Sequence, residues 1–172
     1  KNYNIYDGLI IPGTGDILLS ITQEIQLTGA IIITTPHELS YIDVEKGIEM
    51  FQKVNVPIHG IIENMSYFKC NPCSEKFHIF GKGRLQKTAT KHHIKNWYEI
   101  PILAELSNYN DKNTPFLYNT NNAEIKDLFK RIANDTAWEI IQSEKQPVIT
   151  TEYNNETSIL TVKSADKIKT FS

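Results

Sequence analysis

Cys70 and Cys73 are the residues of this chain whose type and spacing most directly allow chemistry, and they are its only cysteines. The C-x-x-C spacing lets two thiolates converge on one metal ion or iron–sulfur cluster. A redox pair is the second interpretation, although a thioredoxin-like motif opens a helix directly after a strand and this one lies in a predicted loop. Two unliganded cysteines are the third. The spacing alone leaves all three open.

The number of thiols narrows what kind of metal site is possible. A cubane [4Fe–4S] cluster takes four thiolates, and one chain supplies two. Two copies related by a two-fold axis supply all four. A zinc site needs further ligands in the same chain, for which His78 is the nearest candidate, with His92 and His93 more distant.

Two further segments can face a ligand. Gly13, Thr14 and Gly15 follow an apolar run and precede a helical pattern, where glycine lets backbone N–H groups approach an anion. Asn64 follows another apolar run, and its amide can donate to and accept from a base edge. An ordinary strand-to-helix turn and an ordinary strand end explain these residues equally well from spacing alone.

Composition and charge exclude several classes of function. The formal net charge is −2, which gives no general attraction for nucleic acid or an anionic membrane. The basic run Lys82–Lys95 has no interleaved aromatic residues and is typical of a solvated helix face. No apolar run approaches the ~20 residues of a membrane helix. Two cysteines are too few for a disulfide framework, which favours a reducing, cytoplasmic setting.

The pattern of apolar runs predicts the elements that position these residues. Leu9–Ile11, Ala30–Thr34 and Ile58–Ile62 are typical of buried parallel strands. Helical spacing follows Ile17 and recurs from Tyr41 to Phe51, with Ser40 and Asp43 resembling a capping box. This alternation predicts an α/β fold with a doubly wound, mostly parallel sheet and flanking helices.

The rest of the chain is predicted to be less regular. Glu63–Gly83 reads as an irregular insertion, Arg84–Ile94 as a helix, Tyr98–Leu103 as a fourth strand, Asn108–Asn121 as turns and Ala123–Ile141 as an amphipathic helix. From residue 146 the sequence changes to a β-rich or disordered tail with hairpin character, so we expect regions 1–145 and 146–172. The first residue, Lys1, suggests a piece of a longer polypeptide.

Taken together, the segments PGTGD, TGAIIITTPHELSYIDVEKGIEMFQKVNVPIHGIIENMSYFKCNPC and HIFGKG resemble the Mrp/ApbC family of iron–sulfur cluster carriers, which are MinD-like P-loop ATPases. The resemblance implies a homodimer in which Cys70 and Cys73 of both copies hold a bridging [4Fe–4S] cluster for transfer to apo iron–sulfur proteins. It also implies ATP and Mg²⁺ as ligands, with Gly13, Thr14 and Gly15 near the γ-phosphate and Asn64 at the adenine.

The chain departs from that family at the phosphate side. No G-x-x-x-x-G-K-[ST] loop occurs, and the family's D-x-P-P-G-T-G-D is shortened here to Ile11 followed by Pro12. The Walker A lysine and the Walker B aspartate are therefore missing, so we expect poor ATP binding by this chain alone. The expectation is the C-terminal part of such a carrier; a non-catalytic zinc-stabilised C-x-x-C module and a decayed remnant are the alternatives.

Overall fold

The computed structural model describes part of the chain. The described residues are Ser20, Thr22 and Glu24, the ranges 27–70 and 72–103, Glu105, the range 115–144, and the strands 150–154, 159–164 and 167–171. The predicted strand Leu9–Ile11 and the site residues Gly13, Thr14 and Gly15 lie outside them. The predicted helix after Ile17 is described only at Ser20, Thr22 and Glu24, which are helical.

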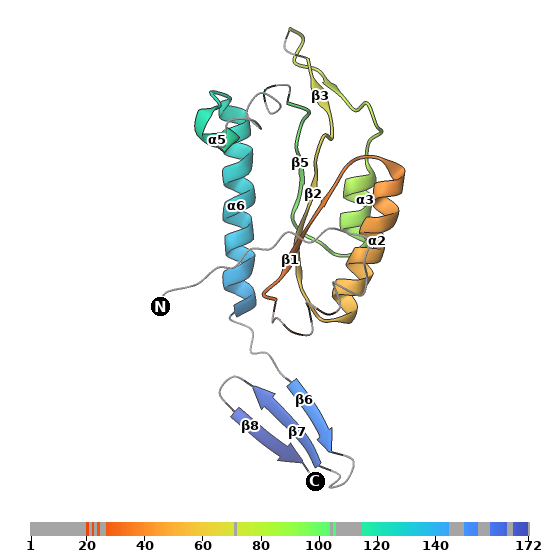
Figure 1. The fold of residues 1–172 in the computed structure, drawn as a ribbon, viewed down its shortest axis with the longest axis vertical. Helices are drawn as coiled ribbons and strands as arrows, with labels where there is room; N and C mark the ends of the chain where they lie inside the picture. Colours follow the sequence, from red (N-terminus) through yellow and green to blue (C-terminus); the bar gives the residue numbers. More distant parts are fainter. Residues whose placement is uncertain are drawn as a thin grey trace.

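The central sheet is parallel and has the strand order β1-β2-β5 in the described part of the chain (Figure 1). Its strands are β1 (Ala30–Thr34), β2 (Ile58–Glu63) and β5 (Trp97–Glu99). The predicted parallel α/β sheet is therefore confirmed. The predicted fourth strand is shorter than expected, because Pro101 has no N–H group with which to continue the ladder.

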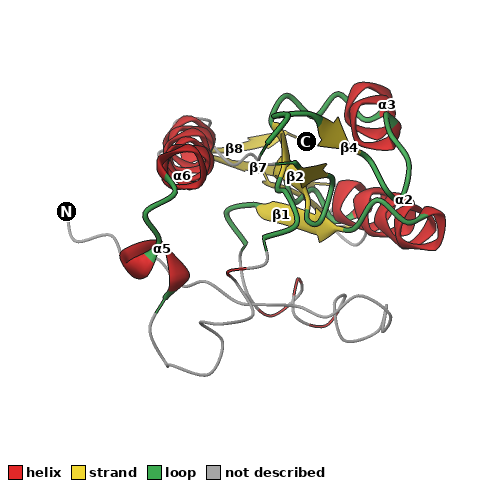
Figure 2. Cartoon of the chain, turned by 90° about the horizontal axis from the view of Figure 1, so that it is seen from above, coloured by secondary structure: helices red, strands yellow, loops and turns green. Residues whose placement is uncertain are grey.

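Helices cover both faces of this sheet (Figure 2). On one face lie α2 (Glu38–Lys53) and α3 (Arg84–Lys91), and on the other lies α6 (Ala123–Glu144). Successive residues of β2 separate the two cores, since Ile61 packs with α2 and α3 while Ile62 packs with Ile132 of α6. The sequence therefore needs apolar residues on both sides of β2, and its unbroken apolar run provides them.

The start of α2 differs from the prediction. The helix begins at Glu38, and the Nδ1 atom of His37 accepts the Leu39 N–H at 3.3 Å as the N-cap. The expected capping box at Ser40 and Asp43 is therefore wrong. Ser40 instead shares a hydroxyl hydrogen bond of 2.8 Å with Thr35, in the loop that follows β1.

Two helices end in the same motif, and neither uses glycine for it. Asn55 after α2 and His93 after α3 adopt left-handed φ values of 57°. Their N–H groups bond back to Gln52 and Thr90, while the next residues, Val56 and Ile94, bond to Phe51 and Ala89. This is the Schellman pattern, which turns the chain sharply into β2 and toward β5.

The predicted irregular insertion contains a short antiparallel hairpin. Its strands are β3 (Phe68–Lys69) and β4 (Lys76–Phe77), which rise beyond the sheet (Figure 1). A single-turn helix, α5 (Phe116–Asn119), lies within the predicted turn-rich stretch. The strands β6 (Thr150–Asn154), β7 (Ile159–Ser164) and β8 (Lys167–Phe171) form a separate antiparallel sheet. Among the described helices, none is long and apolar enough to cross a membrane.

A close approach at the start of β1 gives a stability prediction. A Cβ atom on Gly29 would lie 2.0 Å from Nε2 of the buried His59 imidazole. Gly29→Ala should therefore lower the free energy of unfolding by about 1–3 kcal/mol, as overpacking does. Urea unfolding of this variant and of Gly29→Ala/His59→Ala tests it, because the second substitution removes the ring. An equal loss from Gly29→Ala in both backgrounds would contradict the proposed clash.

Candidate functional site

Cys70 and Cys73 lie at the tip of the β3–β4 hairpin, and main-chain hydrogen bonds close that tip. The Cys70 N–H donates to the Glu75 carbonyl at 3.0 Å, and the Ser74 N–H donates to the Cys70 carbonyl at 2.8 Å. Ser74 has a left-handed φ of 58°, which lets the chain reverse within these few residues. The backbone therefore brings the two thiols together on an exposed projection.

The electrostatics of the tip favour a thiolate. Cys73 is exposed and Cys70 is half-buried, and both are free. A hydrogen bond with the Cys70 thiol, followed by one from the Glu75 backbone, lowers the pKa of Cys73 below its ordinary value. Thiolates are the form that binds metals and exchanges ligands. The pair therefore has the donor set for a soft metal centre, facing solvent.

His78 does not join the thiols. Its ring packs against the ring of Tyr67, with centroids 5.8 Å apart. His92 contacts the Glu45 carboxyl group at 2.7 Å, so its ring is used in a hydrogen bond that joins the end of α3 to α2. Among the residues that the structure describes, no group of three or more His, Cys, Asp or Glu side chains could hold a metal ion. Within the described residues, the two thiols therefore stand without a third ligand of these types beside them.

A buried carboxylate anchors the entry to the hairpin. Glu63, the last residue of β2, is 4% exposed and accepts hydrogen bonds on both oxygens. One comes from the Tyr41 hydroxyl of α2, and the other from the fully buried Ser66 hydroxyl at 2.6 Å. Burial, and then the bond to Glu63, raise the pKa of Tyr41, so the phenol keeps the proton that it donates.

The exit from the hairpin is tied to the same region. Arg84, the first residue of α3, donates to the Pro36 carbonyl at 3.1 Å and pairs with Glu38 at 3.4 Å. The Pro36 carbonyl belongs to the loop that follows β1. Both ends of the insertion are therefore fixed at the carboxyl edge of the sheet, where parallel α/β sheets bind ligands.

Asn64 sits at this edge, between β2 and the hairpin. Its N–H donates to the Thr34 carbonyl at 2.7 Å, which joins the ends of β1 and β2. Its side-chain oxygen accepts the N–H of Met65 at 3.0 Å, and Met65 is left-handed with a φ of 56°. Of the predicted site residues, Cys70 and Cys73 thus meet at the tip, and Asn64 lies at the base of the hairpin.

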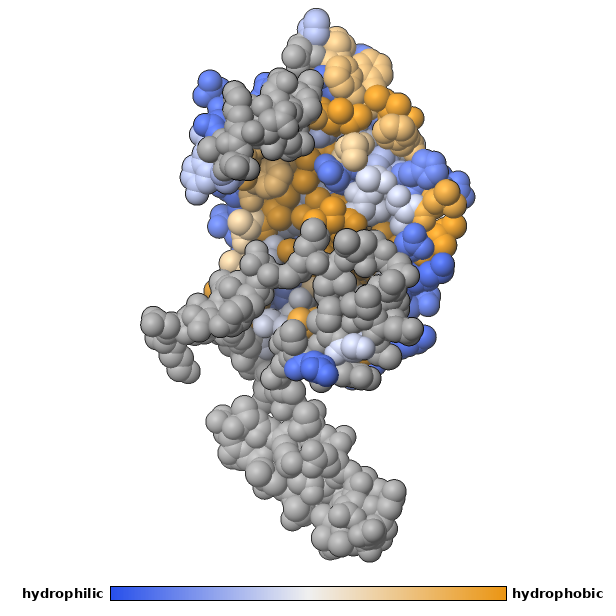
Figure 3. Space-filling view, in the orientation of Figure 1, coloured by the Kyte–Doolittle hydropathy of each residue, from blue (hydrophilic) through white to orange (hydrophobic). Residues whose placement is uncertain are grey.

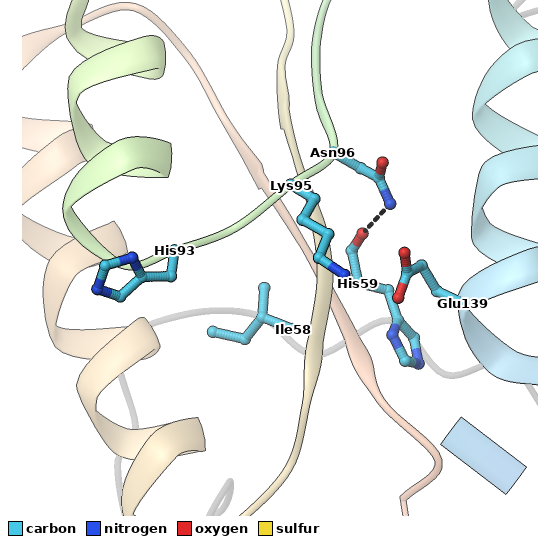
Figure 4. Close-up of a pocket in the computed structure, with 6 residues that line it drawn as sticks. All are labelled: Ile58, His59, His93, Lys95, Asn96 and Glu139. Carbon is cyan, nitrogen blue, oxygen red and sulfur yellow. Dashed lines mark hydrogen bonds between the residues drawn. The ribbon is translucent and has the colours of Figure 1, made fainter. Parts of the chain in front are cut away.

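Two hollows lie beside the strands of the parallel sheet, at different places. The smaller one, of about 90 Å³, opens at the amino ends of β2 and β5, the edge opposite the hairpin (Figure 4). It is lined by Ile58, His59, His93, Lys95, Asn96 and Glu139. This volume lies well below the range of ligand pockets, about 300–1,000 Å³, so the hollow is too small for a nucleotide.

The larger hollow, of about 460 Å³, lies between the base of the hairpin, β5 and α6. Its lining includes Tyr67, Lys76, Trp97 and Arg131. This volume falls within the range of ligand pockets, about 300–1,000 Å³. Asn64, Cys70 and Cys73 are not part of its lining, so it is separate from the predicted site.

A protein-family model matches most of this chain. The family described as ParA, the NUBPL iron-transfer P-loop NTPases, matches residues 2–137. The chain belongs to this family. The family's iron-transfer function agrees with paired thiols at an exposed tip, and its P-loop fold agrees with the parallel sheet covered on both faces.

The relatives are much longer than the matched segment. The iron–sulfur cluster carrier protein of Aquifex aeolicus is 39% identical over 122 residues, which cover 71% of this chain and 34% of the relative. That of Escherichia coli K12 is 40% identical over 73% of this chain and 34% of the relative. The iron–sulfur cluster transfer protein NUBPL of Mus musculus is 36% identical over 72% and 39%. The chain thus spans about a third of their length.

A solved structure is also similar to this chain. The nucleotide-binding protein in complex with ADP from Archaeoglobus fulgidus is 39% identical, with a TM-score of 0.49. The match covers 54% of this chain and 38% of that one.

The Glu63 network was not predicted from the sequence. A glutamate directly after an apolar strand is typical of the end of the strand, and only the structure shows that Glu63 is buried beside Tyr41 and Ser66.

The β3–β4 hairpin had a detectable signal in the sequence. Phe68-Lys69 and Lys76-Phe77 are short alternating runs on either side of the cysteines, with a Pro-containing turn between them.

The first prediction from the site concerns the thiol pair. Cys70→Ala removes the leading hydrogen bond to Cys73, so the pKa of Cys73 should rise toward its ordinary value. The pH profile of alkylation by iodoacetamide, read by mass spectrometry at Cys73, should shift to higher pH. Glu124→Gln, which removes only the ion pair of Lys69 on the same hairpin, is the control. An unchanged profile in Cys70→Ala would show that Cys70 does not activate Cys73.

The second prediction concerns the Glu63 anchor. Tyr41→Phe leaves one oxygen of a buried carboxylate without its donor and should cost about 1–3 kcal/mol in unfolding free energy. Tyr98→Phe is the matched control, since Tyr98 is equally buried and donates to Asp135 at 2.7 Å. Asp135 is only half-buried, so water can replace the hydroxyl there. Chemical denaturation should show the larger loss in Tyr41→Phe; equal losses would refute the special role of Glu63.

Proposed function

We propose that this chain is the cluster-carrying part of an iron–sulfur carrier ATPase, acting in the cytoplasm. Cys70 and Cys73 of two copies hold one bridging [4Fe–4S] cluster as cargo, which is passed to apo iron–sulfur proteins. The observation that carries the proposal is the pair of adjoining thiols at an exposed tip, one with a lowered pKa, in a member of an iron-transfer family.

The stoichiometry supports sharing between copies. Each iron of a cubane takes one thiolate, and the described part of one chain offers two such ligands and no third side chain beside them. A second copy related by a two-fold axis completes the set without any new residue type. Because free thiols must stay reduced to act as ligands, a reducing compartment suits this chemistry.

The position of the thiols supports transfer as well as binding. Ligand exchange needs an incoming thiolate of the receiving protein to reach an iron atom while a carrier thiolate leaves it. Cys73 is exposed, so the attacking group meets no covering element of the described chain. The lowered pKa of Cys73 increases its thiolate fraction and also makes it a better leaving group.

The nucleotide role is proposed for the whole carrier. Gly13, Thr14 and Gly15 would contact phosphates, and the Asn64 amide would contact the base, at the edge of the sheet from which the hairpin rises. Asn64 joins the ends of β1 and β2 through the Thr34 carbonyl, so a ligand there lies next to both the Glu63 anchor and the entry to the hairpin. Regions 1–145 and 146–172 remain our division of the chain into carrier part and tail.

Anaerobic reconstitution with iron and sulfide tests this function. We expect broad visible absorption and about four iron and four sulfide per two chains, as the four-thiolate rule requires. Cys70→Ser/Cys73→Ser should lose this iron, whereas His78→Ala should keep it. Iron retained by the double serine variant contradicts the assignment. Zinc without acid-labile sulfide would indicate the metal-stabilised module, and the absence of a cooperative melt would indicate a decayed remnant.

A further inference from the structure

Strand β5 forms one edge of the parallel sheet, and no described strand lies on its outer side (Figure 1). The Ile100 N–H donates to the Glu63 carbonyl of β2. The main chain at Ile100, and two residues earlier at Tyr98, therefore faces β2, and because successive residues of a strand alternate, Trp97 and Glu99 turn their N–H and carbonyl groups outward. An open strand edge of this kind is a template for a further strand.

The hollow of about 460 Å³ lies beside this edge, between β5, the base of the hairpin and α6. Charged side chains from all three parts line it, namely Lys76, Glu99, Glu124, Asp127 and Arg131. The exposed phenylalanines of the hairpin do not line it, although hydrophobic residues gather at the hairpin end of the molecule (Figure 3). The hollow is therefore a charged site, separate from that apolar surface.

The three carboxylates of the hollow each have a partner outside its lining. The pairs are Glu124 with Lys69, Asp127 with Lys130 at 3.7 Å, and Glu99 with the Ser66 hydroxyl at 3.3 Å.

The two cations of the hollow lie on aromatic rings instead. The Lys76 ammonium is 4.2 Å from the ring centroid of Tyr67, and the Arg131 guanidinium carbon is 5.5 Å from that of Tyr98. Within the described part of the chain, neither cation forms an ion pair with a carboxylate. A ring covers one side of each cation and leaves N–H donors for an incoming anion. The charges of the hollow thus favour an acidic ligand.

We propose that a short acidic segment of another protein binds along β5 as an added strand, with its carboxylates on Lys76 and Arg131. Its main chain pairs with the outward groups of Trp97 and Glu99, and carboxylates at alternate positions of an extended chain point to the same face. The pairing ends at Glu99, because Pro101, the next residue that faces outward, has no N–H group. The two cations select acidic over basic segments.

The position of this site has a consequence for the thiols. Lys76 belongs to β4 of the hairpin that carries Cys70 and Cys73, so a protein bound along β5 is held beside that hairpin. No thiol takes part in the contact, and the inference therefore does not rest on the proposed function.

An NMR titration that follows the main-chain amide signals of the full chain tests the proposal. The probe is the acetylated and amidated peptide Glu-Val-Glu-Val-Glu. We expect saturable shifts at Trp97 and Glu99, with a Kd that rises with salt as exposed ion pairs are screened. N-methylation of the first, third and fifth residues, or of the second and fourth, removes the donors on one edge of the peptide, so only one of these sets should abolish binding.

Variants test the two cations. Lys76→Gln/Arg131→Gln should raise the Kd about threefold or more, as the loss of two exposed ion pairs allows. Lys46→Gln/Lys53→Gln is the matched control, because it removes two exposed lysines of α2, on the opposite face of the sheet, and it should leave the Kd unchanged.

Several results would overturn the inference. They are the absence of saturable shifts at millimolar peptide, equal binding of Lys-Val-Lys-Val-Lys, equal shifts with free glutarate, which would indicate a site for small carboxylates, and an unchanged Kd in the Lys76→Gln/Arg131→Gln variant. If that variant does not fold, the peptide series on the unaltered chain decides.

Iron reconstitution separates this inference from the proposed function. Lys76→Gln/Arg131→Gln should bind as much iron as the unaltered chain, since both cysteines remain. A chain that binds the peptide but no iron keeps the inference and loses the function, and a chain that binds iron but no peptide does the opposite.

Discussion

The carboxyl group of Glu63, buried at the carboxyl end of β2, fixes the start of the insertion that carries the β3–β4 hairpin. It is held by a hydroxyl from α2 on one oxygen and by Ser66, at the start of the insertion, on the other. A buried acceptor that loses its donor costs more than an exposed one, so these two hydrogen bonds favour the observed conformation of the segment from Glu63 to Ser66. The left-handed Met65 is tolerated because this network over-determines it.

This rigid base explains how a two-residue pair of strands can project a reactive tip. An isolated hairpin of this length is unstable in water, and few of its own hydrogen bonds support it. Here the entry is fixed by Ser66 and the exit by Arg84, while Lys69 holds the middle to α6. Contacts with the rest of the domain stabilise the hairpin, so its tip with Cys70 and Cys73 can project into solvent and keep its conformation.

Much of the fold was predictable from residue patterns. The unbroken isoleucine runs predicted β1 and β2, because strands buried on both faces are apolar at successive positions, and helical spacing predicted α2, α3 and α6, because helices buried on one face repeat their apolar residues every three or four positions. The capping residue of α2 was not predictable in this way, since His37 acts through one ring nitrogen and the Ser40 hydroxyl finds Thr35 instead. Local choices of this kind depend on how the flanking loop is held.

The residues of the candidate site also differ in how far the sequence predicts them. The C-x-x-C spacing allowed Cys70 and Cys73 to meet, because two intervening residues suffice for a turn, but it left the use of the thiols open. The partnership of Glu63 with Tyr41 could not be read from the sequence, since the two residues are 22 positions apart and only the packing of α2 on the sheet joins them. The position of His78 away from the thiols likewise depends on the packing of its ring against Tyr67, which the sequence does not reveal.

The turn that holds the cysteines is closed by two main-chain hydrogen bonds, from the Cys70 N–H to the Glu75 carbonyl and from the Ser74 N–H to the Cys70 carbonyl. Every amino acid carries a main-chain carbonyl group, so substitutions at position 75 leave the closing acceptor available, whereas the left-handed φ of Ser74 favours glycine, asparagine or aspartate as replacements there. The charge and shape of the side chains around the thiols can therefore change without removing the main-chain bonds that set the spacing of the two sulfur atoms.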